Sequence, residues 1–271
     1  MESGNQIMAC RDWDRTSRAR LGILIQHGRR QLRQITALAL PDYCQICESL
    51  IPARIGGGLC RTCSSSIHRI EHACKRCGAP IPSVVGPVEG CLHCRHGRWP
   101  ADRVSAWGIY QGTLSKAVVL MKQPGSEPLA HSLGRMMGKW LKAVPEISDF
   151  DAILPTPKHW MKRIARPHNS SELLAEQIGF SLHTPVIRGG LIRVRSTAKQ
   201  GTLLRNERAE NVKGAFRIAR PKKFRGQRVL VIDDILTSGA TAAEMVSVLF
   251  AGGAKHVEVA CLARGIGQAG S

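Results

Sequence analysis

The sequence predicts an α/β protein whose parallel sheet carries helices on both faces, preceded by a small cysteine-rich module. Three observations support this fold class. Strand-like and helix-like patterns alternate after residue 102, and such alternation is typical of parallel sheets with right-handed crossovers. Four Cys-x-x-Cys pairs precede this region. One apolar strand, Val229–Ile232, leads into two carboxylates, a glycine turn and a helix; in such sheets, ligands bind at the carboxyl ends of the strands.

Length and composition agree with two folded units. A chain of 271 residues with 43% apolar side chains has room for one medium domain and a smaller one. We expect a basic extension with a helix over residues 1–40, the cysteine-rich module over 41–98 and the α/β domain over 99–266. No apolar run approaches the ~18 residues of a membrane span, and no signal-peptide core opens the chain. The expected location is therefore the cytoplasm.

The charge is strongly basic and unevenly distributed. The formal net charge is +19, and residues 188–228 hold 13 basic and 2 acidic side chains, an excess of +11. A sugar phosphate would account for a few of these charges, and a nucleic acid for many more. An ordinary solvated basic face is the simpler alternative.

The four Cys-x-x-Cys pairs predict two structural zinc sites. Each pair can place two thiolates on one ion, and two pairs complete a tetrahedral Zn–S₄ site. Disulfides are the alternative for an even number of cysteines, but they are rare in the cytoplasm. Pairing in chain order is favoured over a cross-braced arrangement. The expected zinc ligands are Cys44, Cys47, Cys60 and Cys63 in one site and Cys74, Cys77, Cys91 and Cys94 in the other.

The remaining elements can be assigned in chain order. β-Branched and apolar runs predict strands, and apolar residues at helical spacing predict helices. The expected strands are Arg103–Tyr110, Phe150–Leu154, Ala215–Ile218, Val229–Ile232 and His256–Ala263, the last of which should close the sheet. The expected helices are Thr113–Lys122, Leu129–Leu141, Asn169–Ile178, Leu203–Asn211 and Ala242–Ala251, preceded by a basic amphipathic helix at Arg20–Leu40.

The stretch 228–241 carries the clearest chemistry. Asp233 and Asp234 follow the strand, and Thr237–Thr241 forms a small, hydroxyl-rich turn before the helix. Turn N–H groups and the helix dipole attract a phosphate, and Gly239 lets the backbone come close to it. The carboxylates can accept hydrogen bonds from ribose hydroxyls or help to hold Mg²⁺. A Walker-B-like site is disfavoured because the chain has no GxxxxGK[ST] loop, and a helix cap needs only one acid.

This stretch resembles the 5-phosphoribosyl-1-pyrophosphate (PRPP) signature of type I phosphoribosyltransferases. With the double zinc ribbon, it makes the chain resemble the ComF family, which is linked to bacterial competence and DNA uptake. The other motifs that carry the resemblance are Tyr110-x-Gly112-x-Leu114 with Lys122, Leu154-Pro155-Thr156-Pro157, Gln200 with Arg208-x-x-Asn211-Val212, and Gly214-Ala215-Phe216. The family's Arg-Gly-Phe-Asn-Gln-Ser stretch is altered here to Arg166-Pro167-His168-Asn169-Ser170-Ser171.

The resemblance implies a type I phosphoribosyltransferase-like sheet and a role for each matching residue. Asp233 and Asp234 would face the ribose hydroxyls as the catalytic carboxylates, with Mg²⁺ bound beside PRPP. The 5-phosphate and the pyrophosphate would each have a loop. The implied ligands are Thr237, Ser238, Gly239, Ala240 and Thr241 for the 5-phosphate, and Thr156 and Lys158 for the pyrophosphate.

The resemblance also implies a role in handling single-stranded DNA, with a competence helicase or another protein docked by the ribbons. Two alternatives stay open. One is an active phosphoribosyltransferase in nucleobase salvage or nucleotide metabolism, and the other is a non-catalytic regulator that senses PRPP. The sequence names no acceptor base, so whether the protein transfers a pentosyl group is left open.

Overall fold

A computed structural model describes residues 42–51, 57–82, 90–95, 99–144, 147, 149–158, 169–195 and 205–266. The expected extension at residues 1–40, with its helix Arg20–Leu40, lies outside these described residues, as does Arg166–His168. The expected domain boundaries at 40/41 and 98/99 stay predictions.

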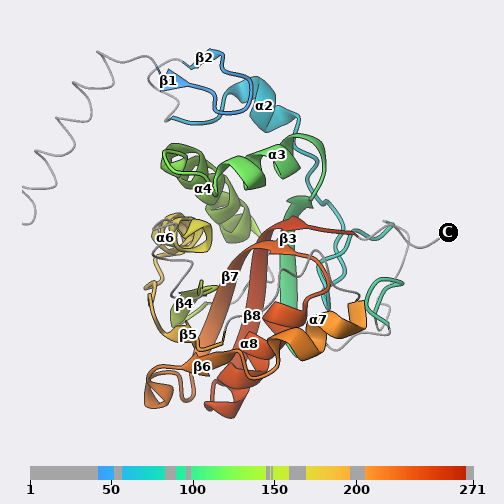
Figure 1. The fold of residues 1–271 in the computed structure, drawn as a ribbon, viewed down its shortest axis with the longest axis vertical. Helices are drawn as coiled ribbons and strands as arrows, with labels where there is room; N and C mark the ends of the chain where they lie inside the picture. The colour runs from blue at the N-terminus through green and yellow to red at the C-terminus, as the bar shows by residue number, and fades with distance from the viewer. Residues whose placement is uncertain are drawn as a thin grey trace, which may run out of the picture.

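Four parallel strands form the main sheet (Figure 1). In spatial order they are β3 (Arg103–Ile109), β8 (His256–Arg264), β7 (Arg228–Leu236) and β4 (Ala152–Pro155). Each neighbouring pair is parallel, as predicted. The last strand of the chain does not close the sheet at an edge, as expected from sequence, but lies inside it. A strand as apolar as β8 is most stable where both of its edges are paired and both faces are covered.

Helices cover both faces of the sheet, which confirms the predicted fold class (Figure 1). Side chains of β7 alternate between the two faces. Val229 and Val231 share one hydrophobic core with α8 (Ala240–Ala251), and Leu230 and Ile232 share the other with three helices. Those three are α3 (Gly112–Leu120), α4 (Glu127–Ala143) and α6 (Ser170–Leu182).

The boundaries of β7 and α8 differ from the predicted ones at the chemically important point. The strand continues past Ile232 to Leu236, so Asp233 and Asp234 lie within β7. The helix begins at Ala240, so the turn is shortened to three residues, 237–239. Pairing with β8 explains the longer strand, because the parallel register extends to Leu236 opposite Arg264.

A separate two-stranded sheet lies beside the main one. Strand β5 (Leu191–Arg193) pairs antiparallel with β6 (Phe216–Ile218). Sequence analysis predicted the second of these strands and missed the first, which is only three residues long. Helix α7 (Arg205–Val212) precedes β6, and a short 3₁₀ helix, Pro221–Lys223, follows it.

The first cysteine module comprises β1 (Asp42–Tyr43), β2 (Leu50–Ile51) and α2 (Arg61–Ser65). It packs on the start of α4, at one end of the molecule (Figure 1). The hydroxyl of Ser132 donates a hydrogen bond to the carbonyl of Gly57 at 2.5 Å. Because Cys44 and Cys63 belong to the same core as α4 and α6, this module shares its interior with the α/β domain.

The second cysteine module lies along β3 (Figure 1). The N–H of Val104, in β3, donates to the carbonyl of Lys75 at 2.8 Å, and the N–H of Ile70 donates to Trp107 at 3.2 Å. Cys74 and Cys77 lie in the core that contains α8. The two modules are therefore attached to opposite faces of one sheet.

Candidate functional site

The paired acids lie at the carboxyl edge of the sheet, where ligands bind in folds of this kind. Asp233 is buried, with 8% of its surface exposed, and its Oδ1 accepts the N–H of Asp234 at 2.9 Å. Asp234 is partly exposed and faces two other elements. Its Oδ2 pairs with Nζ of Lys122 at 3.1 Å and accepts the hydroxyl of Ser170 at 2.8 Å. The acid that a ligand could reach is thus held between a cation and a hydroxyl.

Sequence reasoning assigned no role to these two partners. Lys122, just beyond α3, appeared only as the end of a resembling motif, and Ser170 stands where the family stretch has glutamine. The only available signal was that this altered stretch leads into a helix near the acids. Asn169, also buried, is the N-cap of α6 and donates to the carbonyl of Thr156 at 3.1 Å.

The predicted pyrophosphate loop reaches the same edge. Thr156 follows the end of β4, and its hydroxyl donates to the carbonyl of Ile232 at 3.0 Å, next to the acids. Lys158 is two residues further on and half-buried. The structure therefore brings Thr156 to the acid pair and places Lys158 beyond it along the same loop.

The predicted phosphate turn immediately precedes α8. Gly239 is the N-cap residue and has a φ of +79°, a left-handed conformation that glycine adopts at little cost. A Cβ on Gly239 would lie only 2.4 Å from ring carbons of Trp99. Any larger residue would thus strain the backbone and collide with Trp99, in addition to blocking the approach of a phosphate.

Burial and the neighbouring charge of Asp234 raise the pKa of Asp233 to about 7. Both effects penalise its ionised form, because the carboxylate loses water and faces a like charge. The charge of Lys122 opposes this shift and lowers the pKa of Asp233. Burial lowers the pKa of Arg193, in β5, and the charge of Asp233 partly offsets this effect. A ligand that brings a divalent cation would favour the ionised pair.

We expect the Asp233→Asn variant to be more stable than the parent at pH 8. In the folded chain the carboxyl loses its proton near pH 7, and in the unfolded chain near pH 4, so stability falls as the pH rises through this window. About three pKa units correspond to at most about 4 kcal/mol. Urea unfolding of the parent and the variant at pH 8 and at pH 4 measures the difference in the free energy of unfolding. A gain of equal size at pH 4, or none at pH 8, would contradict the assignment.

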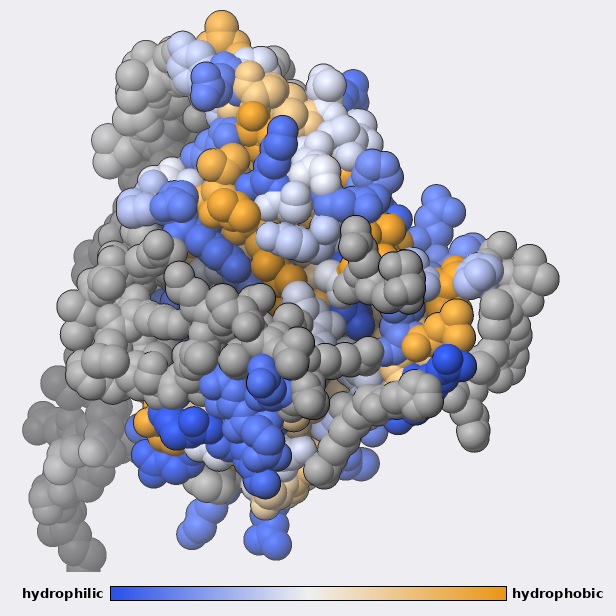
Figure 2. All heavy atoms as spheres, turned by 45° about the vertical axis from the view of Figure 1, so that its right-hand side comes forward, coloured by the Kyte–Doolittle hydropathy of each residue, from blue (hydrophilic) through white to orange (hydrophobic). Residues whose placement is uncertain are grey.

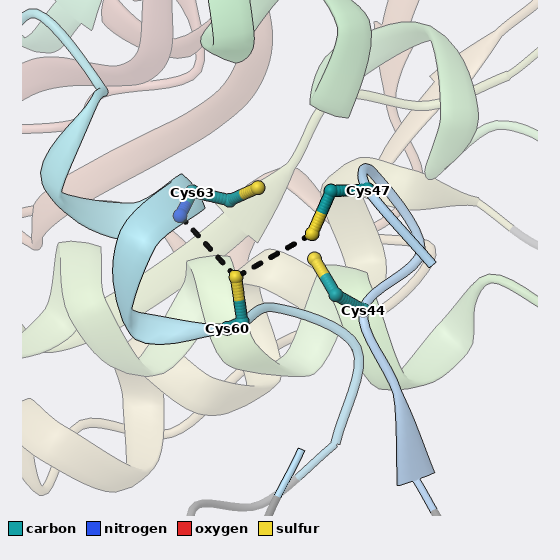
Figure 3. A group of neighbouring side chains, drawn as sticks. All are labelled: Cys44, Cys47, Cys60 and Cys63. Carbon is teal, nitrogen blue, oxygen red and sulfur yellow. Dashed lines mark hydrogen bonds between the residues drawn. The ribbon is translucent and has the colours of Figure 1, made fainter. Parts of the chain in front are cut away.

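The first cysteine cluster matches the pairing predicted in chain order. The four sulfur atoms of Cys44, Cys47, Cys60 and Cys63 lie within 4.8 Å of one another (Figure 3). Sγ of Cys47 and Sγ of Cys60 are 3.7 Å apart. A hydrogen bond from the Ser49 side chain is the main reason that the pKa of Cys47 is lowered, to about 6. That shift favours a thiolate, the form that binds metal.

The second cluster, Cys74, Cys77, Cys91 and Cys94, has the same dimensions. Its sulfur atoms are separated by 3.5 Å (Cys77–Cys91), 3.8 Å (Cys74–Cys94) and 3.9 Å (Cys91–Cys94). A tetrahedral zinc ion with bonds of about 2.3 Å requires sulfurs about 3.8 Å apart, whereas a disulfide requires about 2.05 Å. Both clusters therefore fit one zinc ion each and exclude disulfides among the described cysteines. Neither cluster includes a histidine.

Comparison with known proteins agrees with this architecture. A family model described as phosphoribosyl transferase domain matches residues 180–270. The DNA utilization protein YhgH of Escherichia coli (strain K12) is 28% identical over 231 residues, which cover 84% of this chain and 99% of that protein. Competence protein F of Haemophilus influenzae is 28% identical over 211 residues, covering 76% and 90%. These relatives and the matched domain support a ComF family protein, the family that the cysteine pairs and the PRPP motif suggested.

Among solved structures, the chain matches the glutamine PRPP amidotransferase of B. subtilis with a TM-score of 0.38 and 22% identity. The match covers 54% of this chain and 30% of that one, so the chain spans less than a third of that structure. In the part of the chain that the structure describes, no helix combines the length and the apolar character needed to cross a bilayer.

Proposed function

We propose that this ComF family protein binds PRPP with Mg²⁺ at the carboxyl edge of its sheet and handles single-stranded DNA in competence. The observation that carries the proposal is the arrangement at the end of β7. Two carboxylates, a three-residue turn and the N-terminus of α8 follow one another there. The N-terminus of α8 suits the 5-phosphate, and the carboxylates suit the ribose hydroxyls and the metal ion.

The chain's own residues would bind and orient this ligand. Asp233 and Asp234 would accept hydrogen bonds from the ribose, and Thr237–Thr241 would hold the 5-phosphate. Thr156 and Lys158 would hold the pyrophosphate. Lys122 now neutralises Asp234 and would turn toward the ligand's phosphates once Mg²⁺ supplies the counter-charge. The metal ion would neutralise part of the negative charge of the pyrophosphate.

The DNA part of the proposal is supported by the names of the relatives and by the basic surface. The part of it formed by Lys222, Lys223 and Arg225 is not beside the acid pair, although the two are close in sequence. Lys222, Lys223 and Arg225 are exposed and precede Arg228, the first residue of β7, whereas Asp233 lies about 17 Å further along the strand. The basic cluster is thus at the amino edge of the sheet. Hydrophilic side chains predominate at that end of the molecule (Figure 2).

Stacking of bases on Trp107 and Trp99 would contribute little to such binding. Trp107 and Trp99 are buried, with 1% and 8% of their surface exposed. Phosphate contacts would therefore dominate, and binding would depend weakly on sequence and strongly on salt.

We expect a labelled oligonucleotide to bind with a log–log salt slope of about −0.7 per phosphate neutralised. Replacing Lys222, Lys223 and Arg225 together by Ser should flatten the slope by about 2, since each of the three cations neutralises about one phosphate. Fluorescence anisotropy across a salt series measures this. The matched control replaces three other exposed lysines by Ser, on α3 and α4: Lys116, Lys139 and Lys142. It should leave the slope unchanged.

The same measurements separate the alternatives. Absence of DNA binding even at low salt, combined with nucleotide formation from PRPP and a free base, would overturn the DNA role in favour of salvage. PRPP-dependent association with a protein, without DNA binding or turnover, would favour the regulator.

A further inference from the structure

Arg264, the last residue of β8, connects the second cysteine cluster to the phosphate turn. Only 3% of its surface is exposed. Its Nε donates to the carbonyl of Cys77 at 2.9 Å. Its Nη1 donates to the carbonyls of Leu236 at 2.9 Å and Thr237 at 2.5 Å. One side chain therefore holds a metal-ligand knuckle on one side and the start of the phosphate turn on the other.

Trp99 makes a second, independent connection. It lies five residues after Cys94 in the chain, and its ring centroid is 5.4 Å from the guanidinium carbon of Arg264. The same ring closes the space where a side chain of Gly239 would be, at 2.4 Å. Trp99, which follows the second cluster in the chain, thus packs directly on the turn glycine.

The charge of Arg264 fits a metal-loaded cluster. Its hydrogen-bond acceptors are all carbonyl oxygens, and no carboxylate among the described residues forms an ion pair with it. A buried cation is costly without a compensating charge. Four thiolates with one Zn²⁺ carry a net charge of about −2, and this charge would lie next to Arg264.

The first cluster makes no comparable connection. Its described contacts lead to the start of α4, through Gly57 and Ser132, and to α3, through Ser66 and Thr113. None of these residues belongs to the phosphate turn. The two clusters, alike in ligands and dimensions, therefore differ in what they touch.

We propose that Arg264 is a positioning residue for the phosphate turn, and that the second cluster, through Arg264 and Trp99, fixes the conformation of this turn. Loss of metal from the second cluster then loosens the turn, and loss from the first does not. That the turn binds a ribose 5-phosphate group rests on the proposed function. The connection from the second cluster to the turn through Arg264 and Trp99 does not depend on it.

The connection is tested by hydrogen exchange of the full-length protein, followed in peptides that cover residues 236–243. Cys91→Ser and Cys47→Ser are a matched pair, since each removes one of the less buried ligands of its cluster. We expect Cys91→Ser to raise the exchange rate in the turn about tenfold or more relative to the rate in the core strand β8. Cys47→Ser should leave this ratio unchanged, because a loss of global stability alone raises both rates. Equal ratios in the two variants, whether raised or not, would overturn the proposal.

Arg264→Lys tests the same connection without removing a metal ligand. Lysine keeps the charge, but its compact ammonium cannot reach Cys77 and the turn together. We expect about tenfold faster exchange in the turn, unchanged exchange in α6 and an unchanged zinc content. If the turn of Arg264→Lys exchanges at the same rate as in the parent protein, the proposal is overturned, even if the cysteine variants fail to fold.

Ligand binding gives a readout that general destabilisation would not produce. Arg264→Lys should weaken the binding of ribose 5-phosphate about tenfold. It should leave the binding of pyrophosphate unchanged, because the pyrophosphate would be held at Thr156 and Lys158. Equal weakening of both ligands would contradict a positioning role. If the parent itself binds neither ligand, the proposed function fails, and the exchange experiments still decide the connection.

Discussion

The double variant Asp233→Asn plus Asp234→Asn is expected to lose measurable PRPP binding. Each carboxylate would contribute charge-assisted hydrogen bonds to the ligand, and losing such a bond costs about 1.5–3 kcal/mol. Two of them correspond to at least about a 100-fold weakening. Isothermal titration calorimetry with Mg²⁺ present measures the affinity.

A matched control exists at the other edge of the sheet. Asp149 and Asp151 precede β4 and contact Arg228, the first residue of β7: the carbonyl of Asp149 and the carboxylate of Asp151 accept its hydrogen bonds. Asp149→Asn plus Asp151→Asn removes the same charge far from the proposed ligand and should bind PRPP like the parent. The variant at the carboxyl edge should stay folded, because the charge of buried Asp233 opposes folding at neutral pH. Binding of PRPP by both double variants with parental affinity would show that the site has been misassigned.

The second large effect concerns the metal centres. Purified protein is expected to contain two equivalents of zinc, and Cys44→Ser and Cys74→Ser should each retain one. Each variant should also lower the free energy of unfolding of the whole chain by at least about 3 kcal/mol, because structural zinc contributes on the order of 10 kcal/mol. From sequence alone, each variant would be expected to unfold only its own ribbon. The cores that the clusters share with the helices and the sheet make a single cooperative loss the expected result.

Cys261 provides the control for this experiment. It is fully buried in β8, outside both clusters, and burial raises the pKa of its thiol to about 12. Cys261→Ala should keep both zinc equivalents and should be destabilised only by the small cavity that it leaves. Elemental analysis and urea unfolding give the two readouts. Metal-free protein with both clusters intact would contradict the zinc assignment.

The sequence by itself determined the parallel sheet, its covering helices and the grouping of the cysteines. All three depend on local patterns. Buried parallel strands appear as apolar runs, amphipathic helices have a helical period, and a Cys-x-x-Cys pair can bind one ion with both of its thiolates. The order of the acids, the turn and α8 is also local, so the proposed phosphate site could be recognised as one continuous stretch.

Only the tertiary structure decided what surrounds that stretch. Lys122 and Ser170 come from other elements and meet at Asp234 because α3 and α6 pack on the same face of the sheet. Arg264 and Trp99 reach the turn because β8 lies inside the sheet, next to β7, a position that chain order did not indicate. Conversely, the basic run before Arg228 is close to the acids in sequence but distant in space, because a parallel strand separates its two ends by its full length.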